Sequence, residues 1–216
     1  MIKFKQLLYP KIPTIFKRDS FDNFRYVAVD LWSSSELKYL ASLEWEWSEL
    51  IEGVLIRLCW DGALLSIRGK NLSTKAPAQI EKQFIRAQAT LKSKFLSFFG
   101  SEGHVSFFCI AFGSHLKQGG KYGKTQQINV FDINIEDNWL QRDDIKSMCN
   151  KFDLNPIPIV GTGSLNNMIG KVEKGFNSYY GNFLAAGIVA RPLVELKDHF
   201  NNRIITKLKY KDFRRT

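Results

Sequence analysis

The stretch that decides the fold runs from Trp47 to Leu58 and reads WSELIEGVLIRL. Trp, Ile and Val favour strands, and here they flank a short polar interruption that ends at Gly53. Glycine tolerates the positive φ of a sharp reversal, so we expect a hairpin of strands 43–50 and 54–60. An aliphatic residue, Leu50, stands in the predicted turn. The segment therefore predicts antiparallel sheet.

The rest of the chain continues this pattern, with more strands than helices. Asp61-Gly62 is a strong hairpin signal. Ser164 is a suitable N-cap for a helix. We expect further strands at 24–32, 63–68, 105–112, 126–135, 184–196 and 203–210, and helices at 78–98, 142–152 and 164–174. Because hairpins dominate, the predicted fold class is α+β, with antiparallel β-sheets flanked by helices in a single domain over residues 1–216.

The charge of the chain indicates a phosphate-bearing partner. Thirty-one Lys and Arg against 21 Asp and Glu give a formal net charge of +10. Such an excess favours nucleotides, nucleic acid or anionic lipid as partners, although it can also serve solubility alone. No apolar run approaches the roughly 18 residues that span a bilayer, and three scattered cysteines fit a reduced, cytoplasmic location. Three scattered histidines do not suggest a metal site.

Several short motifs follow one another in a recognisable order. They are KIPTIFKRD, WSELIEGVLIRLCWDG, RGKN, PIVGTG, IVARP and RIITKLKYKDF. This order resembles the phage-type RNA ligases of the covalent nucleotidyltransferase superfamily. The resemblance extends from Lys11 to Phe213 and implies the adenylation-domain fold of RNA and DNA ligases.

The resemblance also implies that the usual reactive groups are replaced. In that family a lysine attacks the α-phosphate of ATP, and Leu50 occupies its place after the matching Glu49. Leucine has no lone pair with which to attack. Phe112 and Ala186 stand where the family has carboxylates that serve a divalent metal. We therefore expect no catalytic residue, no metal and no cofactor, and a protein that is a pseudoenzyme rather than an enzyme.

The resemblance leaves the phosphate-binding lysines in place. The family's last motif is intact as Lys207 and Lys209, and Phe131 is the best match for the aromatic that stacks on adenine. Lysine is a flexible point charge that suits phosphate. The predicted nucleotide- and phosphate-binding residues are Lys207, Lys209, Lys70, Phe131, Glu49, Leu50, Arg191 and Lys117.

These residues suggest a protein that holds a ligand with bases and phosphates. The first hypothesis is retention of a nucleotide, a cyclic nucleotide or an RNA end, for example as a phage-encoded sponge for a host immune signal in a bacterial cytoplasm. One alternative is an RNA-binding or host-protein-interaction module. Another is an active nucleotidyltransferase that uses a different lysine, such as Lys70 or Lys207. The loop 115–124 is either a phosphate-contacting loop or a solvated hairpin, and the tail KYKDFRRT is expected to be a solvated end.

Overall fold

The computed structural model describes residues 7–71, 73–116 and 119–213, and they form two compact units. Unit 1 contains the described residues of 1–10 and 52–157, and unit 2 contains those of 11–51 and 158–216. The antiparallel sheets with a few helices confirm the predicted α+β class. That residues 1–216 form a single domain stays a prediction. None of the described helices has the length and apolar character that a membrane crossing requires.

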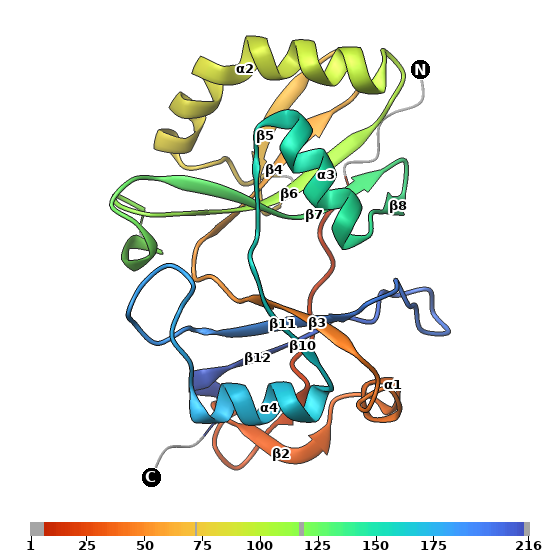
Figure 1. The fold of residues 1–216 in the computed structure, drawn as a ribbon, viewed down its shortest axis with the longest axis vertical. Helices are drawn as coiled ribbons and strands as arrows, with labels where there is room; N and C mark the ends of the chain where they lie inside the picture. Colours follow the sequence, from red (N-terminus) through yellow and green to blue (C-terminus); the bar gives the residue numbers. More distant parts are fainter. Residues whose placement is uncertain (1–6, 72, 117–118, 214–216) are drawn as a thin grey trace. The chain divides into compact units, whose positions relative to one another are not determined.

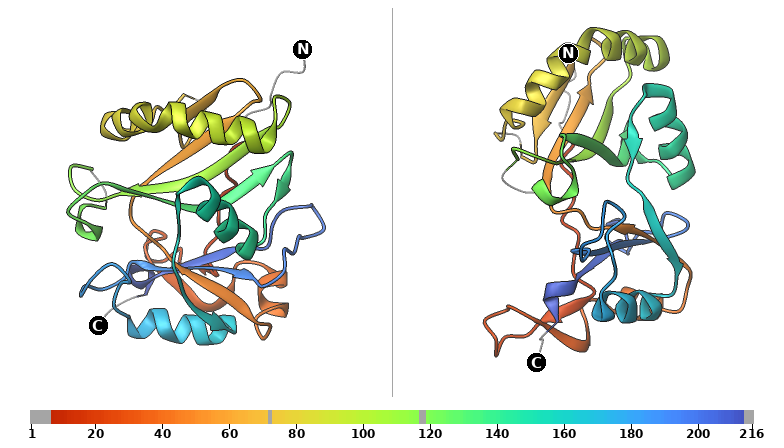
Figure 2. Two further views of the ribbon diagram at one scale, coloured as in Figure 1. Left: turned by 45° about the horizontal axis from the view of Figure 1, so that its top comes forward. Right: turned by 60° about the vertical axis from the view of Figure 1, so that its left-hand side comes forward.

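Unit 1 is a six-stranded sheet with two helices on one face (Figures 1 and 2). The strand order is β5-β4-β6-β7-β8, and β9 pairs in parallel with β7. The core under the helices contains Trp60, Phe95, Phe107 and Phe152, all almost fully buried. The elements are β4 Val54–Trp60, β5 Leu65–Gly69, α2 Ala78–Phe99, β6 Val105–Phe112, η1 Gly120–Tyr122, β7 Gln127–Ile135, β8 Asn138–Trp139, α3 Arg142–Phe152 and β9 Asn155–Pro156.

The other face of this sheet carries buried polar groups that contact the N-terminal arm, residues 7–10. Arg57 is fully buried, and its guanidinium donates to the carbonyl oxygens of Leu7 at 2.8 Å and Gly69 at 3.0 Å. Burial lowers the pKa of Arg57. The Tyr9 hydroxyl donates to Asp132 at 2.8 Å. Since buried polar groups need partners, these contacts fix the arm against the sheet.

Unit 2 is a four-stranded sheet in the order β10-β3-β11-β12, accompanied by a two-stranded sheet, β1-β2 (Figure 1). Alternate residues of its strands, such as Trp45, Ile188 and Leu208, pack with Leu165 and Met168 of α4. The elements are β1 Phe16–Arg18, β2 Val27–Trp32, α1 Ser35–Tyr39, β3 Trp45–Glu49, β10 Ile159–Gly163, α4 Leu165–Lys174, β11 Gly187–Pro192, β12 Thr206–Lys209 and η2 Tyr210–Asp212.

The hairpin expected at Trp47–Leu58 is wrong, although both of its strands exist. β3 pairs with β10 and β11 in unit 2, whereas β4 pairs with β5 and β6 in unit 1. The segment between them passes from one unit to the other. Gly53 does not have a positive φ; instead, a Cβ there would lie 2.5 Å from the carbonyl oxygen of Ala111. Close approach to β6, rather than a reversal, requires this glycine.

The other local predictions hold, with shifted ends. β4 and β5 form the hairpin at Asp61-Gly62, where Gly62 has a φ of +89°. Ser164 caps α4 by accepting a hydrogen bond from Asn167 N at 3.2 Å. The late strands are shorter than expected, 187–192 and 206–209. The prediction that the tail KYKDFRRT is a solvated end is wrong for its described residues, because Asp212 and Phe213 are buried.

Candidate nucleotide-binding residues

Two lysines project from one face of β12 at the edge of the unit 2 sheet. Lys207 and Lys209 are two residues apart, so their side chains point to the same side of the strand. Leu208 between them points the other way and is fully buried in the core. β12 pairs with β11, where Val189 is opposite Lys207 and Gly187 is opposite Lys209. The buried leucine therefore fixes where the two ammonium groups leave the sheet.

A hollow of about 410 Å³ lies beside the first lysine, and we call it the Lys207 hollow. The segment before β1 pairs with Lys207, since Lys207 N donates to Pro13 O at 3.0 Å and Ile15 N donates to Lys207 O at 3.1 Å. The lining residues are Lys11, Ile12, Pro13, Thr14, Arg18 and Lys207. Of these described lining residues, three are cations and none is a carboxylate, so the lining favours an anion.

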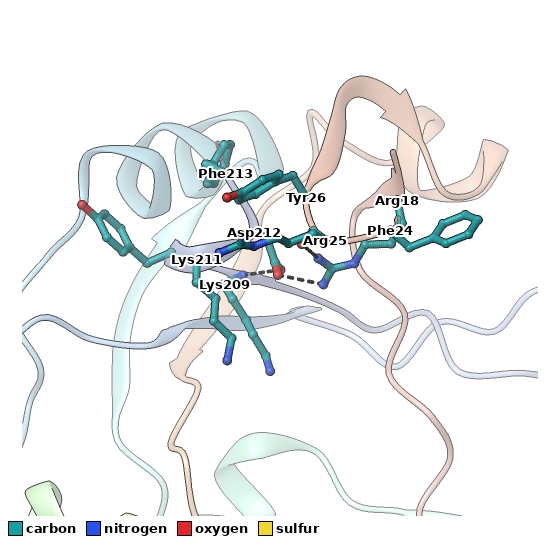
Figure 3. A pocket seen from close by; sticks show the side chains of 9 residues that line it. Arg18, Phe24, Arg25, Tyr26, Lys209, Lys211, Asp212 and Phe213 are labelled. Carbon is teal, nitrogen blue, oxygen red and sulfur yellow. Dashed lines mark hydrogen bonds and ion pairs between the residues drawn. The ribbon is translucent and has the colours of Figure 1, made fainter. Parts of the chain in front are cut away.

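A second hollow of about 610 Å³ lies beside the second lysine (Figure 3), and we call it the Lys209 hollow. It is lined by Arg18, Phe24, Arg25, Tyr26, Lys209, Tyr210, Lys211, Asp212 and Phe213. Asp212 is buried and accepts from Arg18 Nη2 at 2.7 Å and from the backbone N–H of Lys209 at 3.0 Å. Asp212, the single carboxylate among the described residues of this lining, is thus held by its own neighbours, and Arg18 borders both hollows.

The end of β3 carries the two residues at the predicted nucleophile position. Glu49 is fully buried, and its carboxylate accepts from Ser178 Oγ at 2.7 Å and from Tyr179 N at 2.8 Å. Leu50 is half-buried, and its backbone N–H donates to Gly187 O at 2.9 Å. Glu49 therefore ties β3 to the turn at 178–180. Contact of either residue with a nucleotide stays a prediction.

β11 carries two further positions of interest. Arg191 is buried and lies opposite Glu46 of β3. Ala186 is half-buried just before the strand, and its carbonyl oxygen accepts from Tyr210 N at 3.0 Å. A methyl side chain at residue 186 offers no ligand oxygen. The structure thus brings Arg191 into the same sheet as the two lysines of β12.

The other predicted site residues lie in unit 1. Phe131 is the extra residue of a β-bulge in β7, half-buried, with its ring edge-on to Tyr9 at 4.9 Å between centroids. Phe112 is fully buried and packs edge-on against Tyr122 at 5.9 Å. Lys70 is exposed just after β5. Lys117 lies outside the described residues.

The described part of the loop 115–124 is anchored rather than splayed into solvent. Gly113 N donates to Gly119 O at 2.9 Å, and the Tyr122 ring is buried. Lys121 forms an ion pair with Glu52 at 3.2 Å. This loop therefore packs on its own unit through Tyr122 and Lys121. Whether it contacts a ligand stays a prediction.

Four basic residues around the two hollows were not named as site residues from the sequence, and one of them, Lys211, lies in η2. Lys11 and Arg18 lie within KIPTIFKRD, a motif from which only the fold was predicted. Arg25 precedes β2. The available signal was the basic content of that motif, but its proximity to β12 depends on pairing between distant segments.

The described residues do not fit a metal held by the protein alone. No three of their His, Cys, Asp and Glu side chains gather into a metal-binding group. Phe112 and Ala186 also provide no oxygen ligand at the two positions that the resemblance assigns to carboxylates. The basic hollows instead present ammonium and guanidinium donors, which bind phosphate directly.

The fold is similar to that of solved RNA ligases. An RNA ligase of Naegleria gruberi with PPi matches with a TM-score of 0.63 at 14% identity over 93% of this chain. Two mutants of that ligase with ATP and Mn match with TM-scores of 0.63 and 0.64, at 16% and 14% identity, each over 94% of this chain. The chain spans 57% to 59% of those ligase chains. No family model and no curated protein matches it.

These relatives contradict the prediction that the protein is not an enzyme. Each of the solved structures that share its fold is an RNA ligase. The physical flaw in the prediction lies in its step from three replaced positions, Leu50, Phe112 and Ala186, to the whole protein. Leu50 establishes only that residue 50 supplies no amine. Other lysines, including Lys207 and Lys209 of β12, carry amines on the same fold.

Proposed function

We propose that the chain is a nucleotide-binding enzyme of the RNA-ligase type, which binds the phosphates of ATP through Lys207 and Lys209. The observation that carries this proposal is the pair of lysines on one face of β12, each beside a basic hollow. Ammonium groups bind phosphate as point charges, and their effect grows where carboxylates are absent or already paired. Among the described residues, the lining of the Lys207 hollow includes no carboxylate, and the carboxylate that lines the Lys209 hollow, Asp212, is paired with Arg18.

The reaction proposed is nucleotidyl transfer with a lysine other than residue 50 as the attacking amine. An unprotonated Nζ attacks the α-phosphorus, a P–N bond forms, the bond to the β-phosphate oxygen breaks, and pyrophosphate leaves while the amine loses a proton to solvent. Lys207 and Lys70 are the two candidates for this amine. Lys207 borders a basic hollow, whereas Lys70 is exposed after β5, so Lys207 is the first to test.

The binding step is tested by thermal shift with ATP. Binding to the native state raises the melting temperature, by mass action. We expect ATP to stabilise the native protein, and Lys207→Ala with Lys209→Ala to abolish that shift. The matched control removes two exposed helix lysines of unit 1, Lys82→Ala with Lys146→Ala, and should keep it. An unchanged shift in the β12 variant would show that the phosphates bind elsewhere.

The chemical step is tested by intact mass after incubation with ATP and Mn²⁺ and a denaturing quench. The proposal predicts a mass increase of one AMP that Lys207→Arg removes while the ATP-induced shift remains, because the guanidinium keeps the charge but is not a nucleophile. An adduct that survives Lys207→Arg and disappears in Lys70→Arg assigns the reaction to Lys70. No adduct in any variant would refute the transfer.

Cyclic nucleotides and RNA 5′ ends share the phosphate chemistry of ATP. Competition against the ATP-induced thermal shift ranks them, since a ligand of the same lysines must displace ATP. Sequestration of an immune signal and a phage origin stay predictions from the sequence. So does the interaction with a host protein.

A further inference from the structure

We infer that Arg57 of β4 is a positioning residue for Lys70, one of the two candidate amines of the proposed transfer. Both residues belong to unit 1, where Lys70 directly follows β5. Neither of them lines the Lys207 hollow or the Lys209 hollow. The inference rests on the proposed function only where it gives Lys70 a contact with ATP.

The first observation is that each nitrogen of the Arg57 guanidinium donates to a different carbonyl oxygen. Nε donates to Gly69 O at 3.0 Å, Nη1 donates to Leu7 O at 2.8 Å and Nη2 donates to Asn71 O at 3.4 Å. Gly69 and Asn71 are the two neighbours of Lys70 in the chain. The guanidinium therefore holds the backbone on both sides of this lysine, and it connects the same backbone to the N-terminal arm.

The second observation is that this cation is buried without a carboxylate partner. Arg57 is fully buried, and the hydrogen-bond partners of its side chain among the described residues are these three carbonyl oxygens. Burying a charge costs free energy unless its donors are bonded. A neutral side chain of similar size would avoid that cost, but it could not donate from three separate nitrogens of one rigid fork. The fold therefore uses the shape of the guanidinium at this position.

The third observation is a set of hydrogen bonds within the turn that carries Lys70. Gly69 N donates to Thr74 O at 2.8 Å, and Thr74 N donates to Asn71 O at 3.3 Å. The Thr74 hydroxyl oxygen accepts from Asn71 N at 3.3 Å. Gly69 is buried at the base of this turn, whereas Lys70 is exposed. Because the backbone is fixed on its buried side, the lysine side chain leaves the turn from a defined point.

The fourth observation is the charge of the sequence around this turn. From residue 62 to residue 80 the chain contains the cations Arg68, Lys70 and Lys75 and no acidic residue. Such a segment favours phosphate. A lysine whose backbone is fixed also loses less conformational freedom on binding phosphate than a lysine in a mobile segment does. Arg57 therefore supports the contact of Lys70 with a phosphate from inside the core, without reaching the ligand itself.

The first test is hydrogen exchange of the turn, measured by NMR without any ligand. Arg57→Lys keeps the charge, but an ammonium donates from one nitrogen and cannot replace the three nitrogens of the fork. We expect the amides of Gly69, Asn71 and Thr74 to exchange at least about tenfold faster in this variant. Arg68→Lys, at the exposed position opposite Arg57 on β5, is the matched control and should exchange like the native protein. Unchanged exchange in Arg57→Lys would refute the positioning role.

A second variant, Arg57→Gln, keeps the test decisive because a buried ammonium can prevent folding. Glutamine has no charge, and both of its N–H donors are on one nitrogen. It should therefore also leave the turn with faster exchange than in the native protein. Native exchange in Arg57→Gln would show that the turn does not need the fork.

The second test asks whether ATP shields Lys70 from acetylation. Lysines are acetylated at a low reagent concentration with and without ATP, and peptide mass spectrometry gives the rate at each position. At an ATP concentration about ten times its Kd, a lysine covered by ATP should react roughly tenfold more slowly. We expect this slowing at Lys70 in the native protein and in Arg68→Lys. In Arg57→Lys it should be lost while the ATP-induced thermal shift persists. Lys82, exposed on α2, is the internal control and should react at one rate throughout.

The outcomes separate this inference from the proposed function. If ATP changes neither the melting temperature nor the acetylation of any lysine, the proposed function fails, and hydrogen exchange decides whether Arg57 fixes the turn. If ATP raises the melting temperature but does not shield Lys70 in the native protein, the positioning role is overturned and ATP binding stands. Equal shielding of Lys70 in the native protein and in Arg57→Lys would also overturn it, since the lysine would then reach its ligand without the arginine.

Discussion

Unit 1 and unit 2 each contain part of the predicted site, and they use those residues differently. In unit 1, Phe112 is fully buried against Tyr122, and Phe131 packs on Tyr9. In unit 2, Lys207 and Lys209 are half-buried beside basic hollows. Phe112 and Phe131 of unit 1 serve packing, whereas the lysines in unit 2 keep access to solvent. A new charge should therefore be costly at Phe112 of unit 1 and mild at half-buried positions of unit 2.

The largest expected effect comes from Phe112→Glu, which puts a carboxylate back at the position that the resemblance assigns to one. Phe112 is fully buried, so the variant loses an aromatic side chain and buries a charge, a combined cost of about 5 kcal/mol or more. Urea unfolding, or failure to recover folded protein, measures it.

The matched variant in unit 2 is Ala186→Glu, the other position where a carboxylate is replaced. Ala186 is half-buried before β11, so the new side chain can reach water, and we expect a loss of about 1 kcal/mol or less. Equal losses in the two variants would contradict the contrast between the units.

The second-largest expected effect comes from Glu49 and tests whether the fold of unit 2 depends on this buried carboxylate. Glu49 accepts from Ser178 Oγ and Tyr179 N while fully buried. Glu49→Ala leaves these two donors without a partner and should cost about 2 to 4 kcal/mol in urea unfolding. Glu46→Ala on the same strand, half-buried, serves as the control and should cost less. If both variants lose the same stability, the Glu49 bonds do not support the turn.

The sequence predicted most of the local structure because local structure depends on nearby residues. α3 was predicted over 142–152 and extends from Arg142 to Phe152, since its acidic first turn and apolar face lie in one short window. The side-by-side placement of Lys207 and Lys209 followed from the two-residue period of a strand. The α+β class followed from the number of strands.

The remaining features depend on pairing between distant segments. Strand–turn–strand at 47–58 has the same pattern whether the strands pair with each other or enter different sheets, so β3 and β4 could not be separated from sequence. The bulge at Phe131 arises from the register of β6 and β7. Arg18 borders the hollows only because segments nearly 200 positions away in the chain lie beside it. Neither the bulge nor the position of Arg18 has a local sequence signal.

A third, smaller effect concerns the point where the chain passes between the units. Leu50 is half-buried, and its backbone N–H donates to Gly187 O at 2.9 Å. Leu50→Lys therefore should change the free energy of unfolding by about 1 kcal/mol or less, because the flexible stem can bring the ammonium to water. Ile51→Lys is the control at a buried neighbour and should cost clearly more. A large loss for Leu50→Lys would mean that this leucine serves the core, as Phe112 does.

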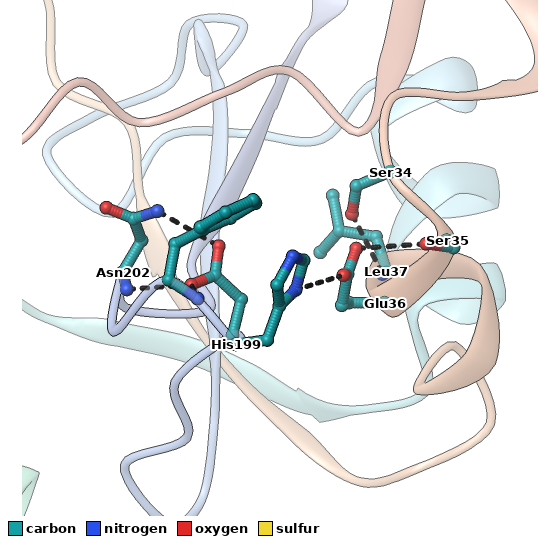
Figure 4. Close-up of polar contacts among 8 residues, drawn as sticks. Ser34, Ser35, Glu36, Leu37, His199 and Asn202 are labelled. Atoms are coloured by element: carbon teal, nitrogen blue, oxygen red, sulfur yellow. Dashed lines mark hydrogen bonds and ion pairs between the residues drawn. The ribbon is translucent and has the colours of Figure 1, made fainter.

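The smallest expected effect is electrostatic and lies in the turn at 198–202 of unit 2 (Figure 4). The Asp198 carboxylate accepts from Asn202 Nδ2 at 3.1 Å, from Asn202 N at 2.8 Å and from Phe200 N at 2.9 Å. The bond from the Asn202 side chain, followed by the backbone bonds, lowers the pKa of Asp198 below its ordinary value of 3.8. The folded protein therefore binds this proton less readily than the unfolded chain does. The resulting stability is present above pH 3.8 and is lost as the pH falls through the lower folded value.

Asp198→Asn should accordingly remove a small part of the stability near neutral pH and flatten the acid limb of the stability profile. The asparagine keeps one acceptor oxygen but no charge, so some of the turn survives. Urea unfolding at several pH values between neutrality and the acid limb measures both effects. Glu102→Gln, an exposed position in unit 1, is the control and should reproduce the native acid limb. If Asp198→Asn keeps the native dependence of unfolding free energy on pH below 3.8, the three hydrogen bonds to this carboxylate do not stabilise the fold. Stabilising polar contacts in unit 2 would then have to be sought at buried groups such as Glu49.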